Sequence, residues 1–225
     1  MKRYTGHSAA FLLAAFLAQS ANAAGWIDLR DGQPLHGDAE AGAARAAANC
    51  VACHRLGDTP VVPTFPIVGG QRAGYIAAAL HEYRLGNRPE SPMSALAANL
   101  SDADIANLSA YFAAQKHPSP APVEADADSL ARGESLYLHG DPAQGIPPCQ
   151  GCHGPDAGGP QGGAPAQLAW PSLRSQNSAY VVQRLQAYRS GALHDSSNDF
   201  IMQGVARTLD DASIQAVADY VSNLR

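Results

Sequence analysis

The sequence predicts an all-α protein made of two tandem domains that derive from an internal duplication. Three observations predict this fold class. Apolar residues recur at helical spacing in several segments, alternating patterns typical of strands are absent, and many residues of the first half recur in the second at nearly constant offsets. A chain of 225 residues is also long enough for two domains of ordinary size.

Two Cys-x-x-Cys-His motifs mark the start of the repeat. At an offset of 99 positions, the motif of the first half matches that of the second: Cys50, Cys53 and His54 correspond to Cys149, Cys152 and His153. Later pairs keep offsets of 105 and then 109 positions, such as Tyr75 with Tyr180 and Met93 with Met202. Small insertions therefore separate two otherwise equivalent halves.

The chain divides into a leader, two domains and a linker. Lys2 and Arg3 precede an apolar run that ends near Ala18 and is too short to cross a bilayer, and small residues at 21–23 form a cleavage signal. Residues 1–23 are therefore predicted to be a signal peptide that directs the mature chain to the periplasm. The domains are expected at residues 36–116 and 130–225, joined by a Pro-rich linker at residues 117–129.

Each half carries the signals of several helices. In the first half, the alanine-rich segment 38–49 and the segment 75–85 favour helix, and Ser101 to Asp104 resembles a capping box that opens another. The second half repeats the later signals at 179–189 and after Asp210. Because each half is short and rich in Gly, Pro and Ala, a large apolar cofactor would be needed to complete its core.

The mature chain is predicted to be acidic. Removal of the leader leaves 13 of the 15 Lys and Arg against 20 Asp and Glu, a net charge of −7, and Lys116 becomes the sole lysine. The sequence shows no basic cluster, which argues against nucleic acid or an anionic-lipid patch as a partner. Redox proteins with basic docking faces are favoured, peripheral association with a membrane stays open, and a monomer is expected.

The two motifs point to covalently bound haem. In the attachment pattern of c-type haem, two cysteine thiols form thioether bonds to the porphyrin and the adjacent histidine ligates the iron. Two haem c groups are therefore predicted, attached to four cysteines and ligated by two histidines: Cys50, Cys53, Cys149 and Cys152, with His54 and His153. A zinc site would have to join the distant repeats, and a thioredoxin-like dithiol would need a strand-and-helix pattern that the sequence lacks.

Two methionines are the candidates for the second axial ligands. Met93 and Met202, the only methionines after the leader, occupy equivalent places, each 12 residues before its matching isoleucine. A lone methionine is more often a core residue, but recurrence in both halves favours ligation, and a thioether ligand raises the reduction potential of the iron. His194, in the insertion before Met202, is an alternative ligand for the second iron.

Further residues are expected around the haems. A ligating histidine usually donates its other ring proton to a carbonyl, and Pro66 and Pro171 are candidate acceptors in the loops after the motifs. Four aromatic residues are expected to line the pockets or to make helix contacts: Phe65, Trp170, Tyr111 and Tyr220. Histidines without a counterpart in the other half are expected at the surface: His36, His81, His117 and His139.

Together these features resemble the dihaem cytochrome c4 family, over nearly all of the mature chain. Besides the motifs and the paired methionines, the resemblance rests on two segments: Gly69-Gly70-Gln71 with Tyr75, and Leu100-Ser101-Asp102 leading to Tyr111. It implies two cytochrome c-like domains related by a pseudo-twofold axis, with haems that face the domain interface. It also implies electron transfer from a quinol-oxidising complex towards a terminal oxidase. The second half departs from the pattern, because Arg174-Ser175-Gln176 replaces the glycine-rich segment.

The predicted function is electron transfer, without catalytic residues, because an iron with His and Met ligands offers no open position to a substrate. The leading hypothesis is a periplasmic carrier between respiratory complexes. A second is the cytochrome subunit of a periplasmic dehydrogenase, such as a flavocytochrome. A third is a dihaem enzyme, such as a peroxidase or a thiosulfate-oxidising cytochrome, in which one iron lacks methionine.

Overall fold

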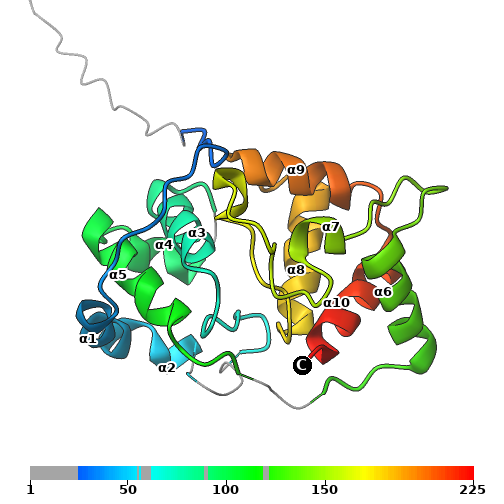
Figure 1. Ribbon diagram of the computed structural model, residues 1–225, viewed down its shortest axis with the longest axis horizontal. Helices are drawn as coiled ribbons and strands as arrows, with labels where there is room; N and C mark the ends of the chain where they lie inside the picture. Colours follow the sequence, from blue (N-terminus) through cyan, green and yellow to red (C-terminus); the bar gives the residue numbers. More distant parts are fainter. Residues whose placement is uncertain (1–24, 55, 57–61, 89–90, 119–121) are drawn as a thin grey trace, which may run out of the picture.

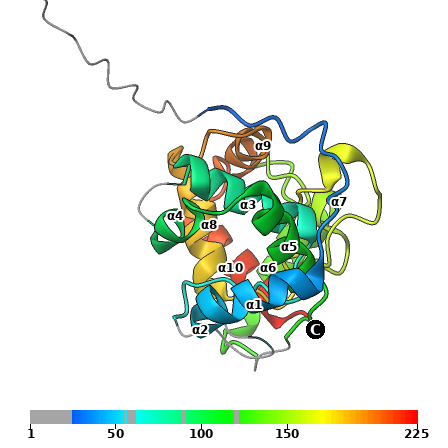
Figure 2. The same ribbon diagram turned by 90° about the vertical axis from the view of Figure 1, so that its left-hand side faces the viewer.

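The computed structural model describes residues 25–54, 56, 62–88, 91–118 and 122–225, so the predicted signal peptide lies outside the described residues. Two groups of helices stand side by side, one from each half of the chain (Figure 1). Seen from the first group, the helices of the second lie behind it (Figure 2). Within the described ranges the structure has no strand, only two isolated β-bridges, so the predicted all-α class is confirmed.

The helices of the two halves follow one another in the same order. The first half contains α1 (Ala39–Asn49), α2 (Val51–His54), α3 (Ala73–Leu85), α4 (Pro92–Ala97) and α5 (Asp102–Ala113). The second contains α6 (Ala127–His139), α7 (Gln150–His153), α8 (Ser178–Ser190), α9 (Ser197–Ala206) and α10 (Asp211–Asn223), with a short 3-10 helix at Pro165–Gln167. In the part of the chain that is described, no helix has the length and apolar character needed to span a membrane.

Polar caps explain where several of these helices begin. The expected capping box is present at α5, where Ser101 and Asp104 each accept a hydrogen bond from the backbone of the other. Asp210 caps α10 in the same place of the second half, by accepting from the N–H of Ser213. Asp126 caps α6, so this helix begins within the segment that was expected to be linker.

The core of each half forms where its first and last helices cross, α1 with α5 and α6 with α10. Small residues at the crossing points allow this close approach. A Cβ on Gly42 would overlap the carbonyl oxygen of Asn107, and a Cβ on Gly133 would overlap that of Ala216. Asn107 and Ala216 are equivalent at the offset of 109 positions, so both halves use the same glycine-mediated crossing.

Replacing Gly133 with Ala is therefore expected to destabilise the second half by about 1–3 kcal/mol, because overpacking forces two backbones apart. Chemical denaturation followed by circular dichroism measures this loss. Gly204→Ala is the matched control: Gly204 is also helical, but nothing lies within 4 Å of its added Cβ. Equal stabilities of the two variants would contradict a steric role for Gly133.

The two halves meet through a reciprocal pair of buried glutamines. The side chain of Gln71 donates to the carbonyl of Ser172 and accepts from its N–H, both at 2.9 Å. Gln176 does the same to the backbone of Ile67, at 2.9 and 2.8 Å. Because Gln71 matches Gln176 and Ile67 matches Ser172 at the offset of 105, the contact has the symmetry of a pseudo-twofold axis.

The second half lacks the glycine-rich segment of the first, but the loop before Gln176 keeps the backbone geometry of the loop before Gln71. Ser175 adopts the left-handed conformation of its counterpart Gly70, with φ of 52° against 71°. Left-handed backbone is unusual for serine, but the Ser175 N–H donates to Val221 O at 2.8 Å, as Gly70 N–H does to Phe112 O. The loop that presents each glutamine is thus conserved between the halves.

The segment before α1 connects the first half to the second. The N–H of Ile27 donates to Asp195 O at 2.8 Å, and Ile27 O accepts from Ser197 N at 3.0 Å. The N–H of Leu29 then donates to Ser197 Oγ at 2.9 Å. Figure 1 shows this segment running from α9 to α1. Residues outside both predicted domains therefore contribute to the contact between them.

Candidate functional site

Each Cys-x-x-Cys-His motif forms a single helical turn. In the first half, the N–H of His54 donates to Cys50 O at 3.1 Å, and in the second, the N–H of His153 donates to Cys149 O at 3.0 Å. This bond places the first cysteine and the histidine of each motif on one face of the turn. All four cysteines are free thiols, so disulfides do not compete for them.

The motif histidines are buried and held in one tautomer. Their Nδ1 atoms lie 2.9 Å from Pro66 O, for His54, and 3.1 Å from Pro171 O, for His153. The two prolines predicted as acceptors are thus confirmed. Burial lowers the pKa of His54 and of His153 below its ordinary value, although the bond to the carbonyl opposes the shift. Each ring is therefore neutral, with Nδ1 protonated and the Nε2 lone pair free for a metal.

Each motif opens into a cavity that the methionine of the same half also lines. The N-terminal pocket, about 690 Å³, is lined by four of the predicted site residues: Cys50, Cys53, His54 and Met93. The C-terminal pocket is lined by the equivalent four: Cys149, Cys152, His153 and Met202. The structure thus brings together, in each half, the motif and a methionine that lies 39 or more positions further along the sequence.

Short helices that the sequence patterns did not indicate carry the two methionines. Met93 lies in the first turn of α4, which Ser91 caps, and Met202 lies in α9, which Ser196 caps. By contrast, the side chain of His194 is 63% exposed, and its Nδ1 lies 2.9 Å from Gly191 O. His194 lines neither pocket, so the geometry favours Met202 as the partner of His153.

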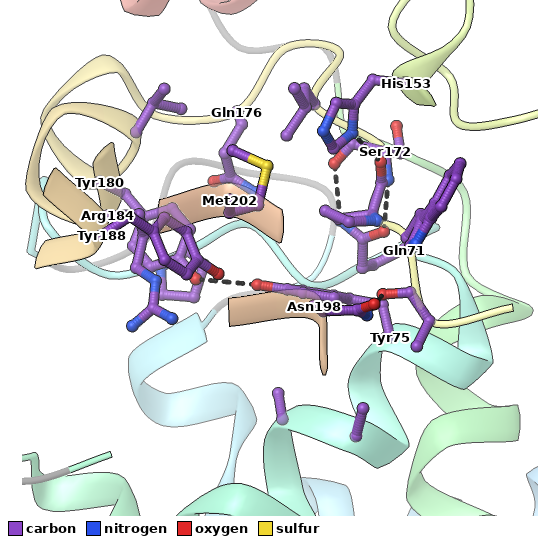
Figure 3. A pocket seen from close by; sticks show the side chains of 18 of the residues that line it. Gln71, Tyr75, His153, Ser172, Gln176, Tyr180, Arg184, Tyr188, Asn198 and Met202 are labelled. Atoms are coloured by element: carbon purple, nitrogen blue, oxygen red, sulfur yellow. Dashed lines mark hydrogen bonds between the residues drawn. The ribbon is translucent and has the colours of Figure 1, made fainter. Parts of the chain in front are cut away.

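The two pockets adjoin at the domain interface, and each is closed by a helix of the other half. Helix α8 adds Tyr180, Gln183, Arg184 and Ala187 to the N-terminal pocket. Helix α3 likewise extends along the C-terminal pocket, where the hydroxyl oxygens of Tyr75 and Tyr180 lie 3.3 Å apart. Figure 3 shows these two tyrosines meeting. The sites are therefore neighbours in a shared, largely apolar interior.

The expected aromatic residues divide into two groups. Phe65 lines the N-terminal pocket and Trp170 lines the C-terminal pocket. Tyr111 packs against the core at the α1 and α5 crossing, and Tyr220 packs against Tyr137 with ring centroids 5.5 Å apart. The latter two make helix contacts, which was the other alternative predicted for them.

The prediction that His117 is a surface residue is wrong. Its Nδ1 lies 3.1 Å from Gly69 O and its Nε2 lies 2.7 Å from Arg174 O. Gly69 and Arg174 are equivalent residues of the two halves, so His117 bridges the domains near the start of the linker. No local pattern predicts this role, because both partners are distant in sequence. His36 and His139 are exposed, as expected, and His81 is half-buried beside Arg84.

Sequence reasoning also missed a buried polar cluster between the pockets. Arg88 lies over the ring of Tyr83, 5.2 Å from its centroid, and Arg184 lies over that of Tyr188 at 5.3 Å. Burial raises the pKa of Tyr75, but Arg88 and Arg184 outweigh this effect and lower that pKa below its ordinary value. The arginines have no counterpart in the other half, so the repeat did not reveal them.

The residues present fit a haem in each half. Each pocket combines an apolar lining, two free thiols and a neutral imidazole with a free nitrogen. At the junction, Nε and one terminal nitrogen of Arg184 are buried without an acceptor, as expected where an acidic cofactor group belongs. No group of three metal-binding side chains occurs among the residues described, which leaves the four-cysteine zinc alternative without support.

Comparison with known proteins agrees with this site. The cytochrome c family model matches residues 39–116 and 130–225. Cytochrome c4 of Thiocapsa roseopersicina is 38% identical over 192 residues, covering 85% of this chain and 95% of that protein. The thiosulfate dehydrogenase electron acceptor of Stutzerimonas stutzeri (strain A1501) is 32% identical over 195 residues, 86% of each chain. The crystal structure of reduced recombinant cytochrome c4 from Pseudomonas stutzeri gives a TM-score of 0.71 at 33% identity, over 84% of this chain and 100% of that one.

Proposed function

Because the chain belongs to the dihaem cytochrome c4 family, we propose that it is a periplasmic carrier between respiratory complexes, which takes electrons from a quinol-oxidising complex and delivers them towards a terminal oxidase. Like its cytochrome c4 relatives, it is an electron-transfer protein and not an enzyme. The signal predicted in residues 1–23 supports the periplasmic location, and the acidic charge supports partners with basic docking faces.

The proposal assigns one haem c to each pocket. Cys50 and Cys53 would attach the first haem, and Cys149 and Cys152 the second. His54 with Met93, and His153 with Met202, would be the axial ligands. The bound haems supply the reversible Fe(III)/Fe(II) couple, while the protein holds the neutral histidines through Pro66 O and Pro171 O and excludes water from the apolar pockets.

One observation carries the proposal: two equivalent His and Met pairs line pockets that adjoin at the domain interface. Two ligands from the chain leave an iron without an open position, which favours electron transfer over reaction with a substrate. Adjoining pockets would also allow an electron to pass between the haems within the protein. A carrier with two such sites can accept electrons at one end and release them at the other.

The ligand assignment predicts a sharp difference between Met202→Ala and His194→Ala. Met202→Ala is expected to open the second iron, which should then bind added cyanide readily and lose its methionine-to-iron absorption band. His194→Ala should leave both properties unchanged, because this histidine is exposed and lines neither pocket. Absorption spectra of the oxidised proteins, with and without cyanide, check this. The opposite pattern would assign the ligand to His194.

Reconstitution tests the proposed partners. The purified dihaem protein should be reduced by a quinol-oxidising complex supplied with quinol, and reoxidised by membranes that contain a terminal oxidase. Stopped-flow absorbance should show rates that fall as salt is added, since charge complementarity steers encounter. Failure of reduction by the quinol-oxidising complex, with both haems loaded, would contradict this position in the chain of electron carriers.

A second function is favoured by the similarity to a thiosulfate dehydrogenase electron acceptor, which extends over 86% of both chains. In this alternative, the protein accepts electrons from a periplasmic dehydrogenase. Rapid reduction by a thiosulfate dehydrogenase with thiosulfate, but not by the quinol-oxidising complex, would establish it over the first. Purification from native cells would show whether the haem protein migrates alone, as expected for a carrier, or with a dehydrogenase.

A further inference from the structure

Two arginines of different domains meet between the pockets. Arg88, from the loop after α3, and Arg184, from α8, both line both cavities. Each guanidinium lies over a tyrosine ring of its own domain. Figure 3 shows Arg184 beside Tyr180 and Tyr188, next to the contact with Tyr75. Two cations in an apolar interior require two anions nearby, because an unpaired buried charge is strongly destabilising.

The protein supplies a partner for only one of them. Arg88 forms an ion pair with Glu82, and both side chains are buried, 5% and 2% exposed. Arg184 has no such partner: its Nε and one terminal nitrogen are buried without an acceptor, and no described carboxylate lies within ion-pair distance. Asp199 also lines the C-terminal pocket but forms no ion pair with Arg184. An anion from outside the polypeptide is therefore needed at Arg184.

The position of Arg184 in α8 indicates which site it serves. The residues of α8 that close the N-terminal pocket are spaced as one helix face: Tyr180, Gln183, Arg184 and Ala187. Ala79 occupies the equivalent place in α3, the helix that extends along the C-terminal pocket. The repeat is thus asymmetric at this helix position: α8 brings an arginine to the N-terminal pocket, whereas α3 has an alanine at the equivalent place.

We propose that Arg184 reaches across the domain interface to bind a propionate carboxylate of the N-terminal haem, and that it raises the reduction potential of that haem above the value it would have without this charge. This inference rests on the proposed haem sites. A guanidinium forms a strong, bidentate pair with a carboxylate. Its positive charge stabilises the reduced iron, which carries one positive charge less than the oxidised iron.

Redox titration of the intact dihaem protein tests the inference in the variants Arg184→Gln, Arg184→Lys and Arg207→Gln. Each haem is followed by the proton resonance of its axial methionine methyl group, assigned by its disappearance in Met202→Ala. In Arg184→Gln, the reduction equilibrium of the N-terminal haem is expected to fall about tenfold, equal to 59 mV for one electron, with a smaller change at the other haem. Arg184→Lys keeps the positive charge, so the reduction potential of the N-terminal haem should fall less.

Arg207→Gln is the matched control, because Arg207 has the same chemistry but is exposed on the surface. It should leave both potentials unchanged. If Arg184→Gln shifts neither potential, or shifts both equally, the assignment to the N-terminal haem is wrong. If Arg184→Gln fails to fold, Arg184→Lys tests the inference instead. An unchanged reduction potential of the N-terminal haem, together with unchanged infrared bands of its propionates, would contradict a specific pair between Arg184 and a propionate. Fewer than two haems in the wild-type protein would instead contradict the proposed function.

Discussion

Replacing Cys149 and Cys152 together with serine is expected to reduce the haem content from two per chain to one, and to unfold the C-terminal domain. Serine cannot form the thioether bonds that hold a c-type haem. The motif helix α7 is a single turn, which is marginal without tertiary support. Haem content by haemochrome absorbance and helicity by circular dichroism measure the two effects.

The physical reason lies in the small core of this domain. Its buried cluster surrounds the pocket, and Val181, Leu209 and Val217 belong both to the cluster and to the pocket lining. Without the cofactor these side chains lose apolar contact, and a domain of fewer than 100 residues has little other burial to offset the chain entropy.

The equivalent variant of the first domain, Cys50→Ser with Cys53→Ser, is the control. It should leave the C-terminal haem in place and keep its methionine-to-iron signature. Two full haems in the Cys149 and Cys152 variant would show that attachment does not depend on these cysteines. Complete loss of both haems in either variant would mean that the domains do not fold independently.

Replacing Gln71 and Gln176 together with alanine is expected to separate the two domains. Each glutamine satisfies one N–H and one carbonyl of the opposite domain, at Ser172 and at Ile67. A buried polar group left without a partner costs roughly 1–3 kcal/mol, and the double variant exposes four such groups. The pseudo-twofold contact should therefore open, although His117 and the segment around Ile27 still connect the domains.

Small-angle scattering of the holo-protein checks this, since an opened pair has a larger radius of gyration than a closed one. Thermal unfolding should change from one transition to two as the domains become independent. Gln144→Ala is the control, because Gln144 is exposed and bonds only within its own turn. An unchanged radius in the double variant would show that the glutamines are not required for docking.

How far the sequence predicted the fold depended on whether a signal was local. Apolar residues at helical spacing, alanine-rich composition and the capping box at Ser101 predicted the long helices α1, α3, α5, α8 and α10, and the repeat predicted two domains. Helices α4 and α9 were not predicted, because they are short and their apolar faces turn towards the pockets. The start of α6 was also missed, since a Pro-rich, acidic composition conceals the cap that Asp126 provides.

For the candidate site, the sequence by itself determined the residue types and their pairing. Adjacent cysteines and histidine must lie within one helical turn, and duplication singled out Met93 and Met202, so these inferences needed no coordinates. Tertiary structure alone decided what surrounds them. The reciprocal glutamines and the bridging His117 join residues that lie 48 to 109 positions apart, and Arg184 lies beside the pocket of the other domain. Such contacts depend on how two folded domains dock, and no spacing along the chain encodes that geometry.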